Sequence, residues 1–161
     1  MVFAARDCTV VGMISSAKIE AWGRFLAVSR AATAAIEHDL KRAGLPPIAA
    51  YEALLALARA GSEGMRPGEL GAALLMPQYG LSRLVDRLER DGLAARAPFP
   101  GDARGQIVHP TDDGLEMLDR IWPVYRDAIA DRFARQMSEE EARFLADLMG
   151  RFASEEAGVA P

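Results

Sequence analysis

Cysteine and histidine are scarce in this chain, which limits its redox chemistry and its metal chemistry. Cys8 is the only cysteine, so no disulfide can form within the chain and no set of thiolates can hold a metal. The only histidines, His38 and His109, do not follow a metal-binding spacing such as His-Glu-x-x-His. The sequence also lacks a glycine-rich phosphate loop and a nucleophile elbow. We therefore expect no enzyme, no metal and no bound cofactor.

Long apolar runs are also missing. No stretch of 18 or more uninterrupted apolar residues occurs, so we expect no transmembrane helix. Residues 1–12 lack the basic start and the continuous apolar centre of a secretory signal. These absences predict a cytoplasmic protein. The 161 residues, 50% of them hydrophobic, predict one domain with a sizeable core.

Basic residues do not predominate, although several gather in the middle of the chain. The sequence has 19 lysines and arginines against 23 acidic residues, a net charge of −4. This balance is evidence against a nucleic-acid partner, because nucleic-acid-binding domains are commonly basic. Residues 66–109, however, carry six arginines against five acidic residues. Because phosphate affinity depends on local contacts, we expect any DNA binding to be strongly salt-sensitive and to need both subunits of a dimer.

The middle of the chain has the pattern of two short helices followed by a hairpin. The helical patterns cover Pro67–Leu74 and Gln78–Arg90, and Gly92 supplies a stop signal. Strand-like runs follow at Leu93–Ala97 and Gln106–His109. The eight residues between them include two prolines and two glycines, which is typical of a loop. This order predicts a winged helix-turn-helix, a fold that lays one helix in the major groove of DNA.

The second of these helices has an apolar face and a polar face. Its apolar residues recur at helical spacing, which predicts that they face the core: Leu81, Leu84, Val85 and Leu88. The other side carries side chains that can reach base edges or phosphates, and we assign DNA contact to Gln78, Tyr79, Ser82, Arg83 and Arg87. Asp86 lies on the same side. A solvated surface without DNA contact remains an open alternative, since any surface helix has a polar face.

The loop of the hairpin carries one further arginine, Arg104, near its tip. An arginine on a protruding hairpin suits the minor groove, where narrow A·T tracts concentrate negative potential. We therefore assign DNA contact to Arg104 as well. In the alternative reading, Asp102 and Arg104 pair with each other and stiffen the loop, and the two roles can coexist.

Helical patterns on both sides of this module predict a scaffold and a dimer surface. They cover about Ser16–Arg42 and Ile48–Ala60, followed after the hairpin by a long helix that Thr111 would cap. Ser138-Glu-Glu-Glu141 has the form of a capping box that opens a last helix. The apolar surface of the terminal helices predicts an intertwined homodimer, whose two-fold symmetry would match a palindromic DNA site. Packing within one chain is the alternative.

Three segments in this order closely resemble the signature of MarR-type regulators: Leu88-Glu-Arg-Asp-Gly-Leu-Ala-Ala-Arg96, Asp102-Ala-Arg104 and Thr111-Asp-Asp-Gly114. With the flanking helices, the resemblance covers roughly residues 16 to 155. It implies an obligate homodimer that binds palindromic promoter DNA and usually acts as a repressor. It also implies that a small aromatic or phenolic ligand often releases the protein from DNA.

The resemblance also organises the chain into parts. Residues 1–15 are expected to be a flexible N-terminal extension, and residues 16–161 a single domain. Within it, residues 47–110 would form the winged-helix DNA-binding lobe, and residues 16–45 and 111–157 the dimerisation helices. The expected fold class is therefore mainly α with a small β-wing.

The DNA-binding lobe departs from the family pattern in three places. Met76 and Pro77 stand where a Ser, Thr or Asp cap is common, so we expect a weaker helix cap. Gly80 lies inside the recognition helix, where it either lets the helix approach DNA closely or is simply tolerated. Pro110 stands where leucine is common, and we expect it to end the wing. With the acidic charge, Pro77 and Gly80 keep a second hypothesis open: a winged-helix protein-interaction module that has lost specific DNA binding.

The sequence points to an effector site less specifically. Six side chains could line an aromatic cleft between the dimerisation helices and the DNA-binding lobe: Trp22, Phe25, His38, Tyr51, Trp122 and Tyr125. The alternative for each aromatic residue is a place in the core. Cys8 carries a third hypothesis, a redox-sensing regulator, because some regulators of this type sense peroxide through a cysteine near the first helix. A cysteine without a sensing role is the alternative.

Overall fold

The protein is a mainly helical molecule with a small two-stranded sheet, as the sequence predicts. A computed structural model describes residues 14–99 and 102–156. Its α-helices are α1 (Ser16–Arg42), α2 (Ile48–Ala60), α3 (Pro67–Ala73), α4 (Gln78–Arg90), α5 (Asp112–Arg132) and α6 (Glu139–Glu156), and its strands are β1 (Ala94–Phe99) and β2 (Asp102–Pro110). Short 3-10 turns at Gly61–Glu63 and Ala134–Gln136 complete the order.

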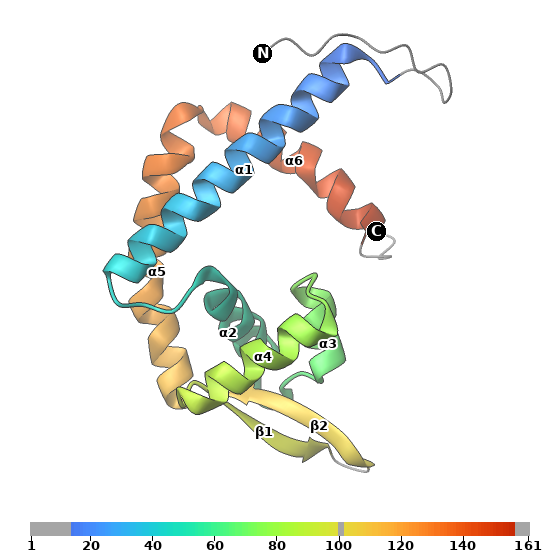
Figure 1. Ribbon diagram of the computed structural model, residues 1–161, viewed down its shortest axis with the longest axis vertical. Coiled ribbons are helices and arrows are strands. Elements are labelled where there is room, and N and C mark those ends of the chain that lie inside the picture. The colour runs from blue at the N-terminus through green and yellow to red at the C-terminus, as the bar shows by residue number, and fades with distance from the viewer. Residues whose placement is uncertain (1–13, 100–101, 157–161) are drawn as a thin grey trace.

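The elements form a compact lobe and a long-helix region, which α5 joins (Figure 1). Helices α2, α3 and α4 pack together above the β1–β2 hairpin, while α1 crosses the far half of α5. No described helix is long and apolar enough to cross a membrane. The arrangement is that of a winged helix-turn-helix lobe with flanking helices.

Local caps explain several of the helix boundaries, and they match the sequence predictions. Thr111 Oγ1 accepts a hydrogen bond of 3.0 Å from the Gly114 N–H at the start of α5. At the start of α6, the Ser138 N–H donates to the Glu141 carboxylate at 2.8 Å, and the Glu141 N–H donates to Ser138 Oγ at 3.3 Å. This pair is the expected capping box. After α1 the chain passes through Gly44 with φ of +68°, a conformation that favours glycine.

The wing is longer than the sequence predicts. We expected residues 98–105 to form a loop, but β1 extends to Phe99 and β2 starts at Asp102, with Pro98 opposite Gln106. That prediction was wrong because a two-stranded ribbon leaves the outer edge of β1 unpaired, so proline can lie there without breaking a ladder. The register shifts between Pro98 and Phe99, which adapts the ribbon to its turn. Pro110 is the last residue of β2, as expected.

Two clusters of buried side chains hold the molecule together. The first fills the lobe and includes Leu54, Leu57, Leu70, Leu81, Leu84, Val85, Leu88, Leu93 and Val108. The second joins α1, α2 and α5 through Ile36, Leu40, Ile48, Tyr51, Ile121 and Ala128. Burial of each large aliphatic side chain stabilises the fold by about 1.5 to 3 kcal/mol. The second cluster includes residues of both α2 and α5, so it holds the lobe against α5.

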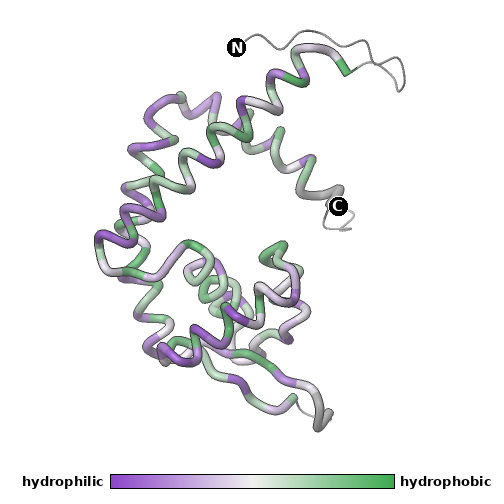
Figure 2. Tube along the Cα trace, in the orientation of Figure 1, coloured by the Kyte–Doolittle hydropathy of each residue, from purple (hydrophilic) through white to green (hydrophobic). Residues whose placement is uncertain are grey.

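The outer helices leave apolar surface uncovered. Figure 2 shows hydrophobic segments along α1 and α6, away from the lobe. The exposed large apolar side chains include Ile19, Trp22, Phe25 and Val28 on α1 and Phe144 and Phe152 on α6. None of the side chains described in α6 is buried. Exposed apolar surface of this extent is typical of an interaction surface.

Candidate nucleic-acid interface

Helix α4 divides into a buried and an exposed face, as its sequence predicts. Leu81, Leu84, Val85 and Leu88 are each at most 6% exposed. The six side chains on the opposite side are all exposed: Gln78, Tyr79, Ser82, Arg83, Asp86 and Arg87. The buried stripe fixes the rotation of α4 about its axis, so these six side chains face outward from the lobe.

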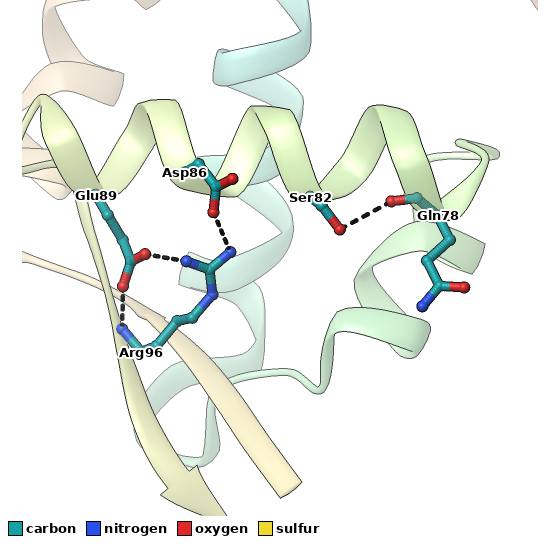
Figure 3. A network of polar contacts seen from close by, with 5 residues as sticks. All are labelled: Gln78, Ser82, Asp86, Glu89 and Arg96. Atoms are coloured by element: carbon teal, nitrogen blue, oxygen red, sulfur yellow. Dashed lines mark hydrogen bonds and ion pairs between the residues drawn. The ribbon is translucent and has the colours of Figure 1, made fainter. Parts of the chain in front are cut away.

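Contacts within α4 organise the exposed face. Ser82 Oγ donates a hydrogen bond of 3.1 Å to the backbone carbonyl of Gln78 (Figure 3). The Arg83 guanidinium lies 4.3 Å from the centroid of the Tyr79 ring, at a distance typical of a cation–π contact. Among the described residues, no carboxylate forms an ion pair with Arg83 or Arg87. Both arginines are therefore available for a phosphate or a base edge.

The turn before α4 combines a weak cap with a strained backbone. Pro77 occupies the cap position of α4 and offers no side-chain hydrogen bond, as the sequence predicts. Leu75 has φ of +51°, in the left-handed region that non-glycine residues rarely adopt, and its side chain is 72% exposed. Among the described residues, a side chain at Gly80 would meet only the Met76 Cε, at 3.5 Å, so packing in this part of the structure does not require glycine there.

A charged cluster that the sequence did not predict joins the wing to α4. On β1, the Arg96 Nη2 lies 2.7 Å from the Asp86 Oδ1, and Nη1 contacts the Glu89 carboxylate (Figure 3). The Arg96 backbone N–H donates to the other Glu89 oxygen at 2.9 Å. The available signal was the signature segment itself, which contains Glu89 and Arg96. Their contact depends on how the wing folds back on α4.

The outer part of the wing has a second arginine contact. The Arg66 guanidinium lies 3.7 Å from the centroid of the Phe99 ring. Met65 also pairs with Val108 of β2 through two backbone hydrogen bonds of 3.0 and 2.8 Å.

Arg104 lies in β2 near the turn, but its side chain is outside the described part of the structure. Its assignment to the minor groove stays a prediction.

The candidate effector residues fall into separate groups. Tyr51 of α2 stacks on Trp122 of α5 with ring centroids 6.4 Å apart, and Tyr125 meets Tyr51 edge-on at 5.1 Å. Trp22 and Phe25 stack on each other on α1, with centroids 6.0 Å apart. Trp22 lies about 20 Å along α1 from Ile36, which packs in the same cluster as Tyr51, because a helix rises about 1.5 Å per residue. One chain therefore does not gather all six residues around one cleft.

Two acidic side chains, Glu37 and Glu52, lie near the Tyr51 group. Partial burial, and then the charge of Glu37, raises the pKa of Glu52, although its side chain keeps contact with solvent. Burial, together with the charge of Glu52, also raises the pKa of Tyr125. The Glu37 carboxylate accepts a hydrogen bond of 3.0 Å from the Ile48 N–H at the start of α2. The two carboxylates make the electrostatic potential beside these rings negative.

His38 lies apart from these rings, beside a small hollow between α1 and the start of α2. The hollow has a volume of about 360 Å³ and is lined by Ala34, Glu37, His38, Lys41, Leu45 and Pro47. Cys8, the candidate redox residue, is outside the described residues. The structure thus gives geometry for the aromatic and histidine assignments, which stay predictions, and none for Cys8.

Comparisons with known proteins agree with this architecture. Residues 38–105 match the family model described as MarR family. A 77-residue segment is 32% identical to YkoM, an uncharacterised HTH-type transcriptional regulator of Bacillus subtilis (strain 168), and covers 48% of this chain and 50% of that protein. A 102-residue segment is 30% identical to the HTH-type transcriptional regulator PecS of Dickeya dadantii (strain 3937), covering 63% of this chain and 61% of PecS. The matches thus span about half to three fifths of these relatives.

Among solved structures, the fold is similar to that of Sco3205, a MarR family transcriptional regulator from Streptomyces coelicolor, whose structure is a complex with DNA. The TM-score is 0.81 at 26% sequence identity, with 92% of this chain and 95% of that chain covered. The likeness therefore extends over the lobe and the flanking helices together.

Proposed function

Because the chain belongs to the MarR family of winged-helix transcriptional regulators, we propose that it binds double-stranded DNA through α4 and the wing. It acts in the cytoplasm as a homodimer on palindromic promoter sites. It represses transcription there, and a small aromatic or phenolic ligand releases it. It functions through binding and not through catalysis.

The observation that carries the proposal is the two-faced geometry of α4. Four large apolar side chains of α4 are buried in the lobe, so the polar face is held outward beside the wing. Gln78 and Ser82 can form hydrogen bonds with base edges, while Arg83 and Arg87 can bind bases or phosphates. That exposed face therefore carries the types of side chain that DNA recognition uses. The DNA complex of Sco3205 supports the same use of the fold.

The homodimer is supported by the apolar surface of the outer helices. Trp22 is 59% exposed, Phe144 is 68% exposed and Phe152 is 60% exposed. A second copy would cover these side chains and would place two α4 helices on successive half-sites. Analytical ultracentrifugation of the free protein tests this part of the proposal.

The first test of DNA binding is fluorescence anisotropy with labelled DNA from upstream of the protein's own gene. The titration is run at two salt concentrations, with random DNA as competitor. We expect specific binding that weakens steeply with salt and involves two subunits per site. If a folded dimer shows no preference over random DNA, selection from random DNA pools follows. Recovery of no sequence from the pools would favour the alternative, a winged-helix module that contacts proteins.

The effector part of the proposal rests on the ring cluster of Tyr51, Trp122 and Tyr125. We propose that a neutral phenolic compound binds beside these rings, with Trp22, Phe25 and His38 as further candidates. The bound ligand would favour a spacing of the two α4 helices that no longer matches successive major grooves. A panel of phenols is added to the preformed DNA complex. If none of the compounds that bind the protein releases it from DNA, the idea is refuted.

The redox-sensing alternative has its own test. Peroxide is added to the DNA complexes of the wild type and of the Cys8→Ser variant. Oxidant-dependent release that persists in Cys8→Ser eliminates Cys8 as the sensor, whereas release confined to the wild type supports it.

A further inference from the structure

The cluster that joins the wing to α4 has a function of its own. We infer that Arg96 is a positioning residue that holds the wing at a fixed angle to α4, the proposed recognition helix. We also infer that Asp86 and Glu89 are required for DNA binding although they are negatively charged. The inference rests on the proposed DNA-binding function, and it assigns Arg96 no contact with DNA.

The first argument is that the hydrogen-bonding groups of Arg96 are already engaged. Its guanidinium contacts both Asp86 and Glu89, and its backbone N–H donates to Glu89. The Arg96 side chain is only 22% exposed. A guanidinium held by two carboxylates has little capacity left for a phosphate, and the three charges together sum to −1. Arg96 therefore differs from Arg83 and Arg87, whose side chains are exposed.

The second argument is mechanical. Glu89 binds the main chain and the side chain of Arg96 at once, so both the position and the direction of β1 are tied to α4. From Arg96 to the turn beyond Phe99 is about four residues, or roughly 13 Å of strand. A tilt of about 10° at Arg96 would therefore move the tip by roughly 2 Å. Without the cluster, α4 and the wing tip could not hold the separation that two adjacent grooves require.

The other contacts of the wing lie elsewhere and do not replace this one. The Met65–Val108 bridge holds β2, on the side of the ribbon away from β1. The Arg66–Phe99 contact holds the outer end of β1 against the start of α3. Only the Arg96 cluster, among the described contacts, ties β1 to the recognition helix through charged groups.

The decisive test removes single charges, because a positioning role and simple electrostatics predict opposite changes in DNA affinity. Asp86→Asn and Glu89→Gln each remove one negative charge near the proposed DNA surface, which by electrostatics alone strengthens DNA binding. If the carboxylates position the wing, each variant instead weakens specific binding by about tenfold or more, the size expected for loss of a charge-assisted hydrogen bond. Asp91→Asn is the matched control, since Asp91 is exposed at the end of the same helix and no described ion pair involves it.

Fluorescence anisotropy at constant salt compares the three variants with the wild type, after thermal melts establish that each is folded. We expect weaker binding by Asp86→Asn and Glu89→Gln and equal or tighter binding by Asp91→Asn. Arg96→Lys should restore part of the affinity that Arg96→Gln loses, because lysine keeps one charged donor. If Asp86→Asn binds DNA as tightly as the wild type or more tightly, the inference is overturned. The Asp86 side chain is 56% exposed, so this change should leave the core intact.

A second measurement does not depend on DNA. Amide hydrogen exchange in the free protein reports how often the wing separates from α4. We expect faster exchange at the Arg96 N–H and along β1 in Arg96→Gln than in the wild type, and equal rates refute the lock. Absence of DNA binding by the wild type refutes the proposed function instead, and the exchange result still tests the lock.

Discussion

Substituting alanine for glycine is expected to have opposite effects at two helical positions, Gly114 and Gly80. An ideal Cβ at Gly114 would lie 2.0 Å from the Leu93 carbonyl oxygen and 3.2 Å from the Leu54 Cδ2. Because the closest atom belongs to the backbone, the start of α5 must move away from Leu93, the residue just before β1. At Gly80 the new Cβ would meet only the Met76 Cε, at the ordinary contact distance of 3.5 Å.

The magnitude at Gly114 follows from the bonds around it. The Thr111 N–H donates to Leu93 at 3.1 Å, Thr111 Oγ1 donates to the Gly92 carbonyl at 2.6 Å, and the Gly114 N–H donates to Thr111. Displacement of the start of α5 breaks the first two bonds and distorts the third, which lowers the free energy of unfolding by about 3 kcal/mol. Gly80→Ala raises it by up to about 1 kcal/mol, because alanine favours the helix. The two variants should therefore differ by about 4 kcal/mol.

Urea and thermal unfolding at one protein concentration measure these differences, since the proposed dimerisation would make apparent stability depend on concentration. We expect the Tm of Gly114→Ala to fall by roughly 10 °C and that of Gly80→Ala to rise by about 3 °C. Gly71→Ala should lie between them, because its Cβ would approach the Leu81 Cδ2 at 3.2 Å and only a side chain must shift. Equal stability of Gly114→Ala and Gly80→Ala would refute the close approach of α5 and β1.

Three further predictions test other parts of the molecule. Ser138→Ala should lower stability at pH 7 because it removes the hydrogen bond from Ser138 Oγ to the Glu141 carboxylate, which acts together with the larger effect of the Ser138 backbone N–H to lower the pKa of Glu141 from its usual value near 4.5. The backbone bond remains in the variant, and denaturation at several pH values should show the difference from wild type shrinking as the pH falls through and below that value. Leu75→Gly should raise the free energy of unfolding by about 1 kcal/mol in urea titrations, since glycine adopts the left-handed backbone without strain; lower stability would contradict this. Arg104→Ala should weaken binding to all DNA sequences and reduce the salt slope by about 1, whereas Ser82→Ala should change sequence preference in a selection from DNA pools; wild-type affinity in both would refute the placement.

The helices were predictable because their signals are local. The bounds of Ser16–Arg42, Ile48–Ala60 and Gln78–Arg90 follow from apolar spacing at the helical period and from adjacent Gly and Pro residues. Thr111 and Ser138 cap their helices as expected, since a cap bonds to a backbone group only three residues away. The same local spacing identified the buried stripe of α4.

The wing and its attachment were not predictable in the same way. The ladder that extends β1 to Phe99 depends on the register between two strands, and proline and glycine in the segment suggested a loop instead. The contact of Arg96 with Asp86 depends on the angle between β1 and α4, which sequence spacing does not specify. The six candidate effector residues come from α1, α2 and α5, and they separate because α1 is long enough to place Trp22 far from Tyr51.

Local sequence patterns predicted the order of the helices, their caps, the outward face of α4 and, through three signature segments, the resemblance to MarR-type regulators. These properties depend on residues a few positions apart, where spacing and side-chain chemistry are sufficient. The length of the wing, the attachment of Arg96 to two carboxylates of α4, and the close approach of Gly114 to Leu93 became clear from the folded molecule. Such contacts form when elements distant in sequence pack against one another, so their geometry emerges from the packing and not from any single segment.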